Sequence, residues 1–90
     1  MKSLSWSPEK NGVLKKTRGI SFEEIILLIE AGDILDVLGN LGHQGQSIYI
    51  LDIEDYAVVV PFEETEDEIF LKTAFPIRKY TKLYIDRGNK

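Results

Sequence analysis

Three runs of β-branched and aromatic residues follow one another between residues 47 and 76 and most restrict what this chain can fold into. They read "SIYILDI", "YAVVVPF" and "EIFLKTAFP", and only the turn-like "ED" and the acidic "EETED" separate them. Such residues favour strands, and short turns between them are typical of antiparallel neighbours. With "DILDVL" at 33–38 as a further strand, we predict an antiparallel four-stranded sheet with residues 56–60 in its central strand.

Two helices are predicted ahead of this sheet. In "SFEEIILLIEAG", Ser21 stands three residues before Glu24 as in a capping box, and Gly32 stands where a left-handed C-terminal residue belongs. An earlier, weaker helix begins at Pro8 with Ser7 as its N-cap, after "SLSWS", which can form a short edge strand. After Pro76, "IRKYTKLY" has helical spacing and predicts a short C-terminal helix.

The fold class is therefore α+β: two N-terminal helices, the four-stranded sheet and a short C-terminal helix. Ninety residues fit one domain, 1–90, because a second core would leave each half too small to offset its chain entropy. No apolar run approaches the roughly 20 residues that cross a bilayer, and the N-terminus lacks the apolar stretch of a signal peptide. We expect a cytoplasmic protein without membrane contact.

Charge is segregated along the chain. The net charge is −4, yet residues 1–18 carry five basic and one acidic side chain, and residues 69–90 carry six basic and one acidic. Residues 19–68 hold thirteen acids and neither Lys nor Arg. Two interpretations stay open: the basic ends lie together on one face and bind a polyanion in a groove, or ends and middle neutralise one another across the surface.

Most catalytic chemistries find no support in the residues. His43, in the glycine-rich "GNLGHQGQ", is the only histidine and there is no cysteine, so a nucleophilic triad and a His or Cys metal site are disfavoured. Glu68 and Lys72 are four residues apart, the wrong spacing for a metal-dependent nuclease. We predict no metal and no cofactor; His43 is a proton-transfer candidate or an ordinary surface residue.

A cationic group near the C-terminus remains, formed by Lys72, Arg78, Lys79 and Lys82. In metal-free RNA cleavage the 2′-hydroxyl attacks the adjacent phosphate, and fixed Arg and Lys donors can stabilise the charge that develops. The alternative is that these are solvated helix charges. Trp6, Tyr80 and Tyr84 are likewise either base-stacking residues or core residues.

Two stretches, "WSPEKNGVLKKTRGISFEE" at 6–24 and "IFLKTAFPIRKYTKLY" at 69–84, resemble the BrnT-like toxins of bacterial type II toxin-antitoxin systems. The residues that carry the resemblance are Trp6, Lys10, Arg18, Gly19, Ile20, Ser21, Phe22, Glu23 and Glu24, then Arg78, Lys79 and Thr81. It implies a RelE-like fold, metal-independent ribonuclease activity on mRNA that inhibits translation, and neutralisation by a small cognate antitoxin.

With that resemblance, the basic residues take expected roles as two groups. The catalytic group is Arg78, Lys79 and Lys72, and the RNA-binding group is Lys10, Lys15, Arg18 and Lys82. The partners are RNA and the antitoxin, and assembly as a homodimer or as a toxin–antitoxin heterotetramer stays open. The alternative is a non-catalytic module of the same fold whose acidic surfaces recruit a basic protein partner.

Overall fold

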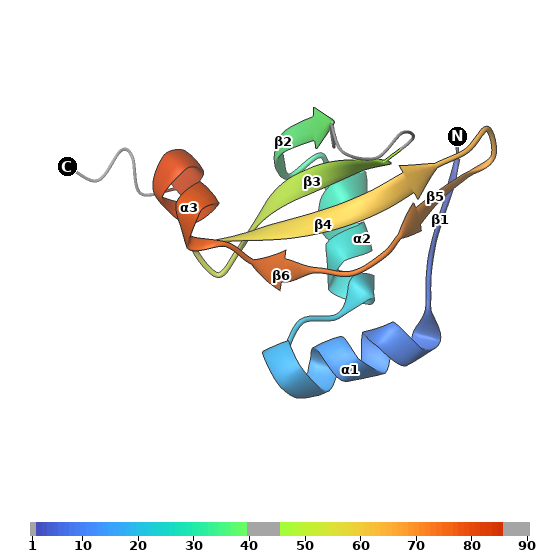
Figure 1. The fold of residues 1–90 in the computed structure, drawn as a ribbon, viewed down its shortest axis with the longest axis horizontal. Helices are drawn as coiled ribbons and strands as arrows, with labels where there is room; N and C mark the ends of the chain where they lie inside the picture. The colour runs from blue at the N-terminus through green and yellow to red at the C-terminus, as the bar shows by residue number, and fades with distance from the viewer. Residues whose placement is uncertain (1, 40–45, 86–90) are drawn as a thin grey trace.

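A computed structural model describes residues 2–39 and 46–85 and has an α+β architecture, with helices packed against a twisted sheet (Figure 1). Strand β1 (Ser3–Trp6) leads into helix α1 (Pro8–Arg18). Ser7 has an extended backbone and its Oγ accepts the Lys10 N–H, while Gly19 ends the helix at φ 68°. The predicted start of this helix at Ser7 and Pro8 is confirmed.

Helix α2 (Phe22–Ala31) has the two ends that the sequence predicts. Ser21 Oγ accepts the Glu24 N–H at 3.1 Å, and Gly32 adopts φ 80° with its N–H directed at the carbonyls of the last turn. Phe22 and Ile25 are fully buried, whereas Leu27 on the other side is 67% exposed. The amphipathic pattern therefore orients the helix as expected.

The predicted strands form, with one difference. Strands β2 (Ile34–Gly39), β3 (Gln46–Ile53) and β4 (Tyr56–Glu64) are antiparallel neighbours, but the last run divides into β5 (Glu68–Leu71) and β6 (Phe75–Pro76). The division lies opposite Pro61, which accepts the Lys72 N–H at 2.9 Å and has no N–H to return. The ladder is interrupted there and resumes at β6.

The sheet is larger than predicted and mixed rather than antiparallel. Within the described residues it has six strands, in the order β1-β5-β4-β3-β2, with β6 also paired to β4. Strand β1 is parallel to β5, so the start of the chain lies beside a strand near its end. Strand β4 pairs with β3, β5 and β6, which confirms its predicted central place.

Two apolar clusters occupy opposite faces of the sheet, because successive residues of a strand point to opposite sides. Val58 and Val60 of β4 face the larger cluster with α1 and α2, whereas Ala57 and Val59 face the smaller one. The smaller cluster is covered by the C-terminal helix, α3 (Arg78–Tyr80), and the π-helical turn η1 (Thr81–Ile85) that continues it. The two ends of the chain thus place their helices on different faces.

Candidate functional site

Much of the N-terminal motif is structural. Trp6 packs near Phe22, with ring centroids 6.2 Å apart, and Gly19 supplies the left-handed end of α1. Asn11 is buried: its Oδ1 accepts the Phe22 N–H at 2.8 Å and its Nδ2 donates to Glu23 at 3.0 Å. These contacts join the two helices, which leaves the exposed Lys10 and Arg18 as the motif cations without a packing role.

Lys10 and Arg18 of α1 line a common hollow. It measures about 490 Å³, and Thr73, from the segment between β5 and β6, lies on its other side. Lys15, which was predicted to bind RNA with them, instead forms an ion pair with Glu23 at 3.8 Å. The structure therefore brings two of the three α1 candidates to one place, next to the chain segment that leads to Arg78.

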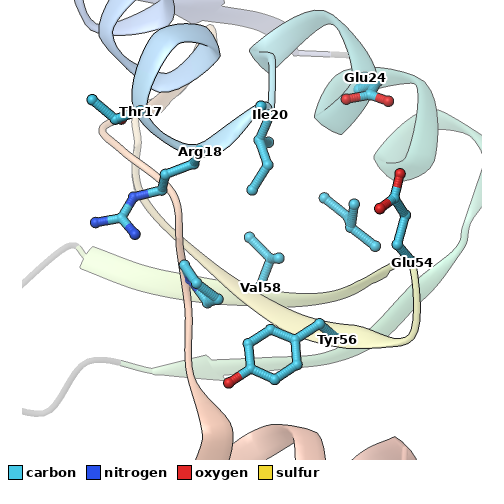
Figure 2. A pocket seen from close by; sticks show the side chains of 10 residues that line it. Thr17, Arg18, Ile20, Glu24, Glu54, Tyr56 and Val58 are labelled. Atoms are coloured by element: carbon cyan, nitrogen blue, oxygen red, sulfur yellow. The ribbon is translucent and has the colours of Figure 1, made fainter.

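Arg18 also borders a second cavity of about 320 Å³ between the end of α1, the start of α2 and the β3–β4 turn. In Figure 2 its guanidinium lies at the opposite side of this cavity from Glu24 and Glu54, and Tyr56 lies at its base. Pro76 of β6 lines the cavity as well. The sequence interpretation missed Glu54 and Tyr56, because residues 54 and 55 carried only the signal of a turn.

The C-terminal cations are displayed by a helix that is anchored through Thr81. The buried Thr81 hydroxyl accepts the Ala57 N–H of β4 at 2.8 Å and donates to the Ile77 carbonyl at 3.1 Å. Arg78, Lys79 and Lys82 are exposed. Among the described residues Arg78 has no ion-pair partner, while Lys79 lies 5.5 Å from the centre of the Tyr80 ring. A fixed backbone thus carries side chains that are free to meet a ligand.

Lys72 does not join this group. It is partly exposed and pairs with Glu63 of β4 at 3.6 Å. Lys2 similarly pairs with Glu64 at 2.6 Å, and Lys15 with Glu23. Three cations of the basic ends are therefore neutralised by acids of the middle segment, as the second interpretation of the charge pattern expected.

The expectation that both basic ends lie on one face is wrong. Helix α1 covers the face with the larger cluster, and α3 with η1 covers the other. The segment from Lys72 to Ile77 passes between them, since its Thr73 and Pro76 line the two Arg18 cavities and Arg78 follows directly. Any basic surface must run over this segment from α1 to α3.

The aromatic stacking group is likewise divided. Trp6 packs with the larger cluster, whereas Tyr80 and Tyr84 pack with the smaller one, 6.0 Å apart. The Tyr84 hydroxyl donates to Asp36 of β2 at 2.6 Å. These three rings are core residues on opposite faces and cannot stack the same base. His43 lies outside the described residues.

Within the part of the chain that the structure describes, Glu23, Asp36 and Tyr49 have shifted pKa values, each because of structural contacts. The hydrogen bond from Asn11, more than the charge of Lys15, lowers the pKa of Glu23. The hydrogen bond from Tyr84 lowers the pKa of Asp36, and burial, with a contribution from the Glu64 charge, raises the pKa of Tyr49. None of these groups lines the Arg18 cavities.

The described residues offer neither a metal-ion site nor a membrane-spanning helix. In residues 2–39 and 46–85 no group of three or more acidic or histidine side chains could hold a metal ion. No helix in the same part of the chain has the length and apolar character that spanning a membrane requires.

Comparison with known proteins found no match. Neither a protein-family model, nor a curated protein, nor a solved structure matches this chain.

Proposed function

We propose that this protein is the toxin of a type II toxin-antitoxin system, with a RelE-like domain that cleaves mRNA without a metal and is neutralised by a cognate antitoxin. The observation that carries the proposal is the exposure of Arg78 and Lys79 on a helix held to the sheet by the buried Thr81. Thr81 accounts for the structural part of the C-terminal motif. Among the described residues Arg78 has no ion-pair partner that explains it, and Lys79 contacts only the Tyr80 ring.

Arg78 is the residue that we assign to the reacting phosphate. A guanidinium offers five donors in a planar fork, and such a fork can bind two phosphate oxygens while charge develops on the phosphorane. Removal of one donor of this kind costs roughly 10²–10³ in rate in other enzymes. We assign Lys79 to the same phosphate. Lys72 has a lesser role in binding this phosphate, because its charge is paired with Glu63.

The RNA backbone would follow the segment between the two basic helices. From Arg78 and Lys82 it would pass over residues 73–76 to Arg18 and Lys10, which line the adjoining hollow. This path keeps the cations on both faces of the sheet in contact with one strand of RNA. Lys15, paired with Glu23, lies outside the proposed path's main contacts.

Controlled expression in a bacterium tests the proposal, with growth and the integrity of total mRNA as readouts. The wild-type chain should arrest growth and cleave mRNA, and Arg78→Ala should do neither while remaining folded. Lys16→Ala is the matched control, because Lys16 is an exposed cation of α1 that lines neither Arg18 cavity. It should behave as the wild type.

Two results would contradict the proposal in different ways. Arrest and cleavage that persist in Arg78→Ala would show that Arg78 is not the phosphate-binding residue. Harmless expression of the folded wild-type chain would instead favour the alternative function, a non-catalytic module of this fold that recruits a basic protein partner.

A further inference from the structure

Three hollows that share lining residues lie along α2 and the β3–β4 turn, with Arg18 at one end. The middle hollow measures about 300 Å³ and is lined by Glu24, Leu27, Leu28, Asp52, Ile53 and Glu54. It shares Glu24, Ile53 and Glu54 with the cavity of Figure 2 and shares Leu28 and Asp52 with a further hollow of about 450 Å³ that reaches β2. We call these three adjoining hollows the acidic groove.

The acidic groove offers an apolar contact that the fold itself does not use. Leu27 is 67% exposed, and Leu28 and Ile53 beside it are only partly buried. At the β2 end, Leu35 is the extra residue of a β-bulge and also lines the groove. A single exposed leucine needs no explanation, but apolar side chains from three separate elements that line adjoining hollows form a surface suited to a partner.

Apart from Arg18 at one end, the charged side chains that line the groove are acidic. Glu24 and Glu54 project toward one another from α2 and the turn (Figure 2), and within the described residues neither carboxylate has an ion-pair or hydrogen-bond partner. Ser21 receives only the Glu24 N–H, so the Glu24 side chain does not complete the capping box that the sequence predicts. A basic side chain placed beside these two carboxylates would interact favourably with both.

The β3–β4 turn holds Glu54 in a backbone conformation that is unfavourable for glutamate. Glu54 and Asp55 both have positive φ, 54° and 66°, as the two central residues of a type I′ hairpin turn do. Asn and Gly are the residues that usually occupy such positions, because the left-handed conformation strains other side chains. Glu54 therefore opposes local preference while supplying charge to the groove.

We propose that the acidic groove binds a basic amphipathic helix of a protein partner. Leucine-like side chains at i, i+3 and i+4 of that helix would pack on Leu27, Leu28 and Ile53, and Lys or Arg beside them would meet Glu24 and Glu54. The ten residues of α2 span about 15 Å, so about ten residues of a partner helix can lie along it. This proposal does not depend on RNA cleavage, because the residues that would contact the partner helix are not among those assigned to RNA.

A designed helical peptide with leucines at i, i+3, i+4 and i+7, flanked by lysines, tests the proposal. The peptide is labelled with fluorescein and titrated with the full chain, and its fluorescence anisotropy is measured. A peptide with glutamates in place of the lysines is the ligand control. Leu27→Ser should weaken binding about tenfold or more, as burial of a leucine requires. The double variant Glu24→Gln, Glu54→Gln should weaken it at low salt and flatten its salt dependence.

Matched variants keep the test specific to the groove. Glu30→Gln changes an exposed acid of α2 outside the groove, and Val13→Ser changes an apolar side chain of α1 that is 60% exposed. Both should bind within about twofold of the wild type. Equal weakening by groove and control variants, equal binding of the two peptides, or no saturable binding would overturn the proposal. So would sedimentation showing a self-dimer that the double variant dissociates, because the groove would then hold a second copy.

Discussion

Replacement of Asn11 by alanine should destabilise the fold mainly through the buried hydrogen bond from Phe22, because its second bond goes to the exposed Glu23 and contributes less. The Asn11 side chain is 6% exposed and accepts the N–H of Phe22, the first residue of α2. An N–H at this position has no partner inside its own helix. Phe22 is fully buried, so water does not replace the lost acceptor in Asn11→Ala.

The expected magnitude follows from two opposing effects. A buried donor left without an acceptor costs about 1–3 kcal/mol, whereas alanine is favoured over asparagine inside a helix by up to about 0.7 kcal/mol. The free energy of unfolding should therefore fall by about 1–2 kcal/mol. In a domain of this size that corresponds to a decrease in Tm of about 5–15 °C.

Thermal and urea unfolding followed by circular dichroism measure this change. Lys16→Ala, an exposed position of the same helix, should stay within about 0.5 kcal/mol of the wild type. Asn11→Asp retains an acceptor for Phe22 but sets a carboxylate against Glu23, so its loss of stability should diminish in acid. If Asn11→Ala and Lys16→Ala have the same Tm and the same free energy of unfolding, the proposed coupling of the two helices is refuted.

Three further predictions concern the anchor, the turn and the pH dependence of stability. Thr81→Val leaves the Ala57 N–H without an acceptor and should lower the free energy of unfolding, measured by urea denaturation, by about 1–3 kcal/mol. Thr81→Ser keeps the hydroxyl and should lower it less, and equal losses in the two variants would contradict the role of Thr81 as an anchor. Asp55→Gly relieves a positive φ and should raise Tm by a few degrees, unlike Asp55→Ala, whose Cβ retains the strain. The folded-state pKa of Glu23 is lowered, so its contribution is present above the unfolded-state pKa and is lost as pH falls through the folded one. The stability gap between wild type and Glu23→Gln should close on acidification, and a gap independent of pH would contradict this linkage.

The surface on one side of Arg18 is suited to a polyanion, and the surface on the other side is suited to a basic partner. The guanidinium of Arg18 and the carboxylates of Glu24 and Glu54 border the same cavity, so the surface changes sign across it. A polyanion and a basic partner helix can therefore bind adjoining surfaces without sharing contacts. This arrangement allows the RNA-binding proposal and the partner proposal to be tested by different variants.

The sequence alone determined the elements whose signals are local. Helix ends depend on bonds or backbone angles within a few residues, and the ends predicted at Ser7, Ser21 and Gly32 are confirmed. Gly19 also ends a helix, but it was interpreted only as part of a motif. The apolar runs likewise predicted β2, β3 and β4. Arg78 and Lys79 were selected as site candidates from the basic group near the C-terminus and from the motif resemblance, and both are exposed.

The tertiary structure decided what depends on distant contacts. Nothing near Ser3 in the chain indicates that β1 lies parallel to β5, and the pairing of Lys72 with Glu63 requires two strands to meet in a particular register. The sheet faces that α1 and α3 cover also depend on contacts between segments far apart in the chain. For that reason charge alone could not assign the basic ends to one surface. Local capping involves neighbours along the chain and is visible in the sequence, whereas the site is assembled from segments whose proximity only the folded sheet creates.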